Sequence, residues 1–282
     1  MFKRFVLFSL LFSLTACGGG ESQYNYEVDH TYGVFLGADG SAKARISAYN
    51  KVAIDIDEFE SSDITYLKNK GCEIYAYLSI GSLENYRDYY EEYKDYAFFE
   101  YTNWPDEKWI DVSQESWQNL LVSEANRFKG LGASGLFMDN FDVYYIASEE
   151  YKGDKVSAES IYNACITILN ALSALNLKLI INSGSTLLER FYEEKRYDLL
   201  NKIDVYCQES VFSNILDYDK DVFGRQEKDE HDYYLSVISF MKKYSEILLL
   251  EYTTDEELKN EITTYCKNNS YHYYVSSHVN LI

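Results

Sequence analysis

The sequence has little proline, little glycine and a shortage of positive charge. One proline and 14 glycines interrupt 282 residues, of which 46% are hydrophobic. This composition excludes a largely disordered chain and indicates an ordered globular protein. Lysine and arginine number 26 against 46 aspartates and glutamates, which gives a formal charge of -20. Because proteins bind nucleic acid through Lys and Arg at its phosphates, we expect no nucleic-acid partner.

Sequence signatures of metal and cofactor chemistry are also missing. The four histidines include no pair at the spacing of a helical zinc motif. No glycine-rich phosphate loop follows the first predicted strand, and no Gly-x-Ser-x-Gly occurs. Beyond Cys17, the cysteines fit no zinc pattern: Cys72, Cys165, Cys207 and Cys266. We expect no metal and no cofactor, and buried free thiols at Cys165 and Cys207.

The first residues resemble a bacterial lipoprotein signal. Lys3 and Arg4 precede an apolar run over 5–14, and Cys17 follows the small residue Ala16. The resemblance implies removal of residues 1–16, lipidation of Cys17 and a flexible tether over 17–31. The folded domain then spans 32–282. We expect the protein to be exported and to be held at the cell envelope by its lipid anchor only. If the source has an outer membrane, we expect attachment there. An ordinary secretory signal is the alternative.

Short apolar runs alternate with amphipathic stretches along the rest of the chain. Eight runs are rich in Val, Ile, Leu, Tyr and Phe, as buried parallel strands are: 32–36, 51–57, 73–81, 135–142, 177–184, 203–210, 246–252 and 271–277. Helical spacing of apolar residues occurs between them at 61–70, 116–130, 158–175, 232–244 and 255–267. This alternation predicts an α/β fold, a single (β/α)₈ barrel. An open doubly wound sheet is the alternative.

Polar side chains follow nearly every predicted strand. They include Asp55, Asp57, Ser79, Asp139, Asn140, Asp142, Asn182, Glu209, Glu251 and Tyr252. Because barrel enzymes carry their active site at the carboxyl ends of the strands, we expect the site there. Asp139 and Glu209 follow apolar strands, where burial tunes ionisation, and a carboxylate pair of this kind suits glycosidic bond hydrolysis. For Asp142 and Asp204 we favour a structural role as a helix cap or ion-pair partner.

A long aromatic-rich loop is predicted after the third strand, over 82–115. It contains six tyrosines and two tryptophans, and a third tryptophan, Trp117, follows it. Flat aromatic faces suit the apolar faces of sugars. We expect a sugar to stack on Trp104 or Trp109, and most of the tyrosines to form a lid.

Five blocks carry a resemblance to a known family. They are residues 55–59, 77–87, 104–111, 139–144 and 208–210, all but the third at or beside the ends of predicted strands. Together they resemble glycoside hydrolase family 114, the endo-α-1,4-polygalactosaminidases, whose fold is a (β/α)₈ barrel. Asn182 and the pair Glu251 and Tyr252 fit the pattern more loosely, and Gln208 stands where we expect an asparagine.

The resemblance implies hydrolysis of α-1,4 links in galactosamine-rich exopolysaccharide, with endo action. It makes Asp139 the nucleophile of a retaining mechanism and Glu209 the acid and base, whereas the residues alone leave retention and inversion open. The implied substrate-binding residues are Asp55, Asp57, Tyr77, Ser79, Glu84, Arg87, Trp109, Asp111, Asn140, Asp142, Asn182 and Tyr252.

The acidity of the chain suits a cationic galactosamine polymer. Partly deacetylated polymers carry ammonium groups, so an acidic cleft would attract them at low salt. We expect Asp55, Asp57 and Asp142 to contribute to this attraction, and most other carboxylates to serve solubility. The alternatives are a lipoprotein that binds polysaccharide without cutting it, and a barrel hydrolase of another α-linked sugar.

Overall fold

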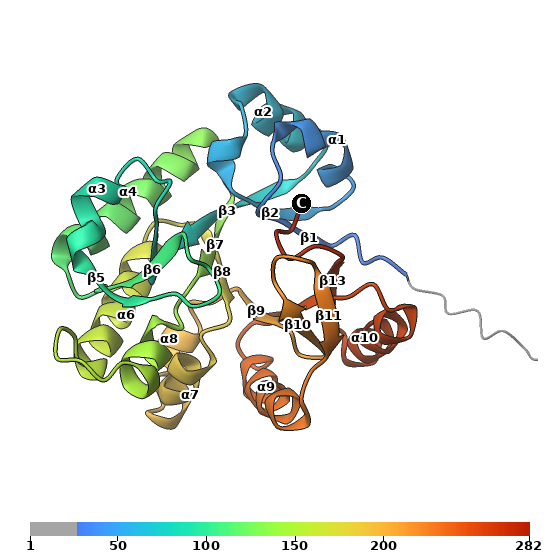
Figure 1. Ribbon diagram of the computed structural model, residues 1–282. Coiled ribbons are helices and arrows are strands. Elements are labelled where there is room, and N and C mark those ends of the chain that lie inside the picture. Colours follow the sequence, from blue (N-terminus) through green and yellow to red (C-terminus); the bar gives the residue numbers. More distant parts are fainter. Residues whose placement is uncertain (1–26) are drawn as a thin grey trace, which may run out of the picture.

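The computed structural model describes residues 27–282, in which eight parallel strands form one sheet. The strands surround a common axis, with helices around their outside (Figure 1). In sheet order they are β1 Tyr32–Phe35, β2 Lys51–Ile54, β3 Glu73–Ser79, β7 Gly135–Asp139, β8 Lys178–Asn182, β9 Val205–Glu209, β12 Glu246–Tyr252 and β13 His272–Ser276. Each predicted run is confirmed as a strand, and the (β/α)₈ barrel is confirmed with them.

The barrel closes between its first and last strands through side chains. Phe35 of β1 and Tyr274 of β13 meet edge to face, with ring centroids 5.3 Å apart. Tyr49 contacts both rings, at 5.3 and 5.8 Å. Aromatic packing therefore joins the two strands that share no hydrogen-bonded register among the described residues.

The main helices lie between successive strands. Five were predicted and are confirmed with shifted ends: α2 Ser61–Asn69, α4 Glu115–Leu131, α6 Ala158–Ser173, α9 Lys228–Met241 and α10 Glu256–Asn269. Ser157 and Asp255 accept hydrogen bonds from the first-turn amides of α6 and α10, as expected of N-cap residues. α7 Ser185–Glu193 is not predicted from the sequence; it follows Gly184 and has no side-chain cap to mark its start.

The remaining helical elements are short. They are α1 Lys43–Ile46, α3 Tyr90–Tyr93, α5 Val143–Tyr145, α8 Tyr197–Leu200, the 3₁₀ turns Gly40–Ala42, Ile56–Glu58 and Lys94–Tyr96, and the π-helix Ile146–Glu150. Each is too short to show a helical repeat of apolar residues in the sequence.

The expected loop after β3 is an ordered insertion with a small sheet of its own. It contains β4 Ser82–Glu84, β5 Ala97–Glu100 and β6 Glu107–Ile110, paired antiparallel in the order β4, β6, β5. A second insertion after β9 forms the hairpin of β10 Ser213–Asp217 and β11 Val222–Arg225, which the sequence analysis missed. Both insertions follow the carboxyl ends of barrel strands and so border the expected site.

The described part of the expected tether lies against the barrel. Asp29 Oδ2 lies 3.0 Å from His272 Nδ1 at the start of β13, and Tyr273 donates its hydroxyl hydrogen to the carbonyl of Glu27. The expected signal peptide, Cys17 and the tether up to residue 26 lie outside the described residues. Within residues 27–282 no helix combines the length and apolar character that crossing a membrane requires.

The core lies inside the sheet and between the sheet and its helices. Trp117 of α4 is fully buried and donates its indole N–H to the carbonyl of Ile80, 2.9 Å away. The four described cysteines are buried with free thiols, as expected for Cys165 and Cys207.

Candidate active site

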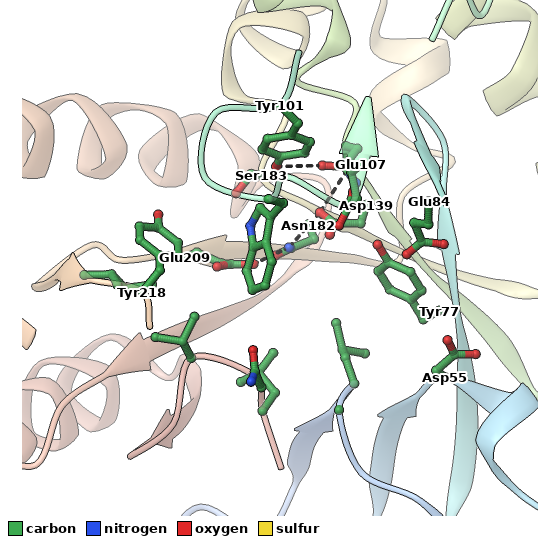
Figure 2. A pocket seen from close by; sticks show the side chains of 18 of the residues that line it. Asp55, Tyr77, Glu84, Tyr101, Glu107, Asp139, Asn182, Ser183, Glu209 and Tyr218 are labelled. Atoms are coloured by element: carbon green, nitrogen blue, oxygen red, sulfur yellow. Dashed lines mark hydrogen bonds between the residues drawn. The ribbon is translucent and has the colours of Figure 1, made fainter. Parts of the chain in front are cut away.

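A cavity of about 450 Å³ lies at the carboxyl ends of the barrel strands (Figure 2). It is lined by nine of the fourteen predicted catalytic and substrate-binding residues: Asp55, Tyr77, Glu84, Asp139, Asn140, Asp142, Asn182, Glu209 and Tyr252. The fold therefore brings together side chains that are up to 197 positions apart in the sequence, Asp55 and Tyr252 being the outermost.

Asp139 and Glu209 face each other across one side chain. They are the last residues of β7 and β9, and Asn182 ends β8 between them. Asn182 Nδ2 donates to Asp139 Oδ1 at 2.9 Å and to Glu209 Oε1 at 2.5 Å. Because both oxygens bind the same nitrogen, Asp139 Oδ1 and Glu209 Oε1 lie at most about 5.4 Å apart.

The chain turns sharply after each of these three strands. Asn140, Ser183 and Ser210 directly follow the site residues and have φ values of 65°, 56° and 53°. This left-handed backbone is unfavourable for residues with a side chain, and such strain concentrates at functional sites. The turns end the three strands where their last side chains face the cavity.

Burial and mutual repulsion shift the ionisation of the pair. Asp139 and Glu209 are both half-buried, and their partial loss of hydration raises the pKa of each, while the charge of Glu209 raises the pKa of Asp139 further. Asn182 opposes the rise at both carboxyls, and the hydroxyl of Tyr252 opposes it at Glu209, where it donates to Oε2 at 2.9 Å. Two close carboxyls that repel in this way titrate as a unit and readily share one proton.

Asp142 both lines the cavity and holds the backbone. Its carboxylate accepts from Gly184 N at 3.1 and 3.2 Å, which fixes the chain at the start of α7. Burial raises the pKa of Asp142 to about 6. The structural role favoured for Asp142 and Asp204 is confirmed, since Asp204 pairs with Lys178 at 2.7 Å and accepts from Leu179 N.

Three further predicted residues, Ser79, Arg87 and Asp57, do not line the cavity but contact residues around it. Ser79 is buried and accepts from Asn140 Nδ2 at 3.0 Å, which fixes the residue that follows Asp139. Arg87 pairs with Asp55 at 2.8 Å and with Glu84 at 2.5 Å. Asp57 lies outside the cavity lining and binds Arg127 through two hydrogen bonds of 2.7 and 2.8 Å.

Trp109 and Asp111 lie away from the cavity lining. Trp109 is 4% exposed and stacks on Tyr101, with ring centroids 4.3 Å apart, so its face is covered by Tyr101. Trp104 does line the cavity and touches Tyr218 edge to face at 5.8 Å. Asp111 accepts from the hydroxyl of Ser113 at 2.6 Å and from Gln114 at 2.6 Å, just before α4.

Gln208 points away from Asp139 and Glu209. Strand side chains alternate, so Glu209 faces the cavity and Gln208 faces α7. Gln208 Oε1 accepts from the hydroxyl of Ser185 at 2.9 Å, and its Nε2 donates to the carbonyl of Glu209 at 3.0 Å.

Several lining residues were missed by the sequence analysis as site residues. Glu107 and Ser183 lie beside residues that it named, whereas Tyr218 and Ile215 come from the unpredicted hairpin. Residues 279–282, after the last strand, also line the cavity. Ser183 lies at the polar end of a predicted strand and could have been named for that reason. No strand pattern or motif in the sequence indicated the hairpin.

No cluster of three or more metal-ligating side chains occurs among residues 27–282. The cavity instead presents carboxylates, amides and phenols. Eight parallel strands around paired, half-buried carboxylates at the strand ends are typical of a barrel glycosidase. The chain belongs to glycoside-hydrolase family GH114, whose family model matches residues 16–278.

Solved structures share the fold at low sequence identity. The glycoside hydrolase domain of PelA from Pseudomonas aeruginosa aligns with a TM-score of 0.73 and 19% identity, over 89% of this chain and 95% of that one. Aspergillus fumigatus Ega3, in complex with galactosamine, aligns with a TM-score of 0.66 and 18% identity, over 90% and 93%. The α-galactosidase of Thermus thermophilus aligns at 0.56 with 10% identity, over 88% and 58%.

One curated relative matches at the sequence level. It is an uncharacterized protein of Thermotoga maritima, 22% identical over an alignment of 179 residues that covers 58% of this chain and 55% of the relative. The match thus spans about half the length of that relative. The family match establishes a glycosidase, and the solved neighbours share its fold.

Proposed function

We propose that this glycosidase cleaves α-1,4 links within galactosamine-rich polysaccharide, with retention of configuration. Asp139 is the nucleophile and Glu209 is the acid and then the base. The observation that carries the proposal is the shared bond to Asn182, which keeps the two carboxylate oxygens within about 5.4 Å. Retaining glycosidases place their carboxyls ~5–5.5 Å apart, whereas inverting ones leave ~6.5–9.5 Å for a water.

The reaction then has two steps. In the first, Asp139 attacks the anomeric carbon and forms an ester while Glu209 gives its proton to the departing glycosidic oxygen. In the second, a water molecule loses a proton to Glu209 and breaks the ester, which restores Asp139 and releases the sugar with its original configuration. Glu209 ends the cycle protonated, as it began.

The charge of the cavity supports an amino sugar as substrate. Six carboxylates line it: Asp55, Glu84, Glu107, Asp139, Asp142 and Glu209. No lysine, arginine or histidine of the described chain does so. A polymer with free ammonium groups complements such a surface. Asp55 and Asp57 contribute less than the sequence suggested, because Arg87 and Arg127 pair with them.

The test is release of reducing ends from a partly deacetylated α-1,4-galactosamine polymer by residues 18–282. We expect release by the parent, falling by at least about 10³-fold in Asp139→Asn and in Glu209→Gln. Glu92 is an exposed residue of α3, and Glu92→Gln is a matched control that should keep full activity. A rapid fall in mean polymer length at low reducing-end yield would support endo action.

Two other outcomes would point elsewhere. A folded parent that binds the polymer without cutting it would support the non-catalytic binding protein. Cutting of another α-linked polysaccharide, but not of the galactosamine polymer, would support a hydrolase of that sugar.

Attachment to a membrane through lipidated Cys17 is a separate part of the proposal. It is supported by the charged, apolar and small-residue segments that precede Cys17. Full-length protein expressed in a bacterium should fractionate with membranes, and Cys17→Ser should release it. Equal membrane association of both forms would contradict lipid anchoring.

A further inference from the structure

Glu107 is a cavity carboxylate with which no cation of the described chain forms an ion pair. The neighbouring Arg87 is already shared between Asp55 and Glu84, at 2.8 and 2.5 Å. The carboxyl group of Glu107 has one hydrogen-bond partner among residues 27–282, the hydroxyl of Ser82, which donates to Oε2 at 2.5 Å. Its other carboxyl oxygen is left for a ligand.

The unpaired charge is costly in this position. Burial raises the pKa of Glu107 to about 7, although the hydrogen bond from Ser82 and the charge of Arg87 oppose the rise, to which the charge of Glu84 adds. Asp55 and Glu84 avoid this cost through Arg87. A cation that enters the cavity would therefore interact more strongly with Glu107 than with its paired neighbours.

Hydrogen bonds place Glu107 beside the nucleophile. Ser82 Oγ, which donates to Glu107, also accepts from Asn140 Nδ2 at 3.0 Å. Asn140 directly follows Asp139, and Asn140 N donates to Asp139 Oδ1 at 2.9 Å. Glu107 thus lies on the Asp139 side of the cavity, whereas Tyr218 lies on the Glu209 side (Figure 2).

The proposed roles of Asp139 and Glu209 imply that the two sides of the cavity hold different parts of the polymer. The acid Glu209 must reach the departing oxygen, so the leaving part of the polymer lies on its side. The sugar that becomes bonded to Asp139, and the chain that continues from it, lie on the other side. This second part, the glycone, keeps the anomeric carbon and ends as the new reducing end.

We propose that Glu107 is the specificity residue that recognises the ammonium group of unacetylated galactosamine on the glycone side. The inference rests on the proposed function and deepens it. An ammonium group supplies the missing counter-charge and a charge-assisted hydrogen bond, whereas an N-acetyl group is neutral and leaves Glu107 uncompensated. Selection is therefore expected at the two sugars nearest the new reducing end.

The experiment is mass spectrometry of the products from a partly acetylated polymer, cut by the parent, Glu107→Gln and the control Glu92→Gln. The parent and the control should produce reducing ends whose last two sugars are enriched in galactosamine. Glu107→Gln should lose this enrichment, with a fall of about 10- to 100-fold in kcat/KM on fully deacetylated polymer. Glu107→Asp, which keeps the charge, should retain part of the enrichment.

Three results would overturn the inference. In the first, Glu107→Gln cuts more slowly but keeps the same product composition, which is the mark of a merely structural role. In the second, the parent enriches galactosamine only at the new non-reducing ends. Both leave the proposed hydrolysis intact. In the third, the parent cuts no galactosamine polymer, which removes the proposed function and the inference together.

Discussion

Tyr252, at the end of β12, donates its hydroxyl hydrogen to Glu209 Oε2 across 2.9 Å. This bond favours the ionised form of Glu209 and works against the burial that raises its pKa. In the proposed mechanism, Tyr252 therefore acts on the proton that Glu209 gives to the leaving group.

Tyr252→Phe removes that donor and keeps the ring. The pKa of Glu209 should rise, so the basic limb of the profile of kcat/KM against pH should move to higher pH. The rate should fall about tenfold, because the carboxylate that must remain after proton transfer loses a hydrogen bond. Tyr206→Phe removes a buried hydroxyl on the α7 side of the sheet and should leave the profile unchanged. Equal profiles for parent and Tyr252→Phe would contradict the role of this bond.

Asn182→Ala removes the donor shared by the carboxyls of Asp139 and Glu209. We expect kcat to fall by about 10²- to 10³-fold, the usual effect of losing one preorganised donor. The comparison requires that the variant remain folded. Circular dichroism and thermal unfolding of the variant should therefore be measured beside its kinetics. Asn85→Ala, which loses an exposed amide bonded to Asp106, is the matched control. A variant with near-parental kcat would show that Asn182 does not position the pair.

Glu209→Gln should lower the pKa of Asp139. The negative charge of Glu209 is one cause that raises this pKa, so a neutral amide removes the repulsion while burial remains. The pKa should fall but stay above the ordinary value of 3.8. Carbon NMR of protein labelled at aspartate carboxyls measures it directly. An unchanged or higher pKa of Asp139 would show that the two groups do not interact.

Arg87→Gln should destabilise the fold more than a surface variant. Arg87 neutralises Asp55 and Glu84, whose side chains are 9% and 3% exposed, so its loss leaves two buried carboxylates unpaired. The free energy of unfolding should fall by about 3 kcal/mol. Arg127→Gln, at a half-exposed pair with Asp57, should cost less than about 1 kcal/mol. Denaturant titration measures the free energy of unfolding of both variants. Equal losses of stability would contradict the claim that Arg87 neutralises two buried carboxylates.

The barrel could be predicted because its strands are buried on both faces. Runs such as 135–139 and 205–209 are nearly continuous in apolar residues, and the polar residues that end them mark the site edge. Asp139 and Glu209 could be named for that reason. Their separation could not, because it depends on how Asn182 of the intervening strand bridges them.

The insertions were harder to predict because their strands are short and half-exposed. β10 and β11 carry few buried residues, and Leu216 and Val222 are 62% and 42% exposed. Trp109 was assigned to the site as a sugar platform, but only the packed structure reveals that Tyr101 covers its face. Glu107 was overlooked as a site residue because its lack of a counter-charge depends on where Arg87 points.

The measurement that tests the central claim most directly is the anomeric configuration of the first product. Proton NMR can follow hydrolysis of a galactosamine oligomer in its first minutes, before the sugar ends equilibrate. Carboxylate oxygens held within about 5.4 Å of each other leave no room for an inverting water, so the account predicts that the α-anomer appears first. Initial appearance of the β-anomer would mean inversion, and would contradict Asp139 as a nucleophile.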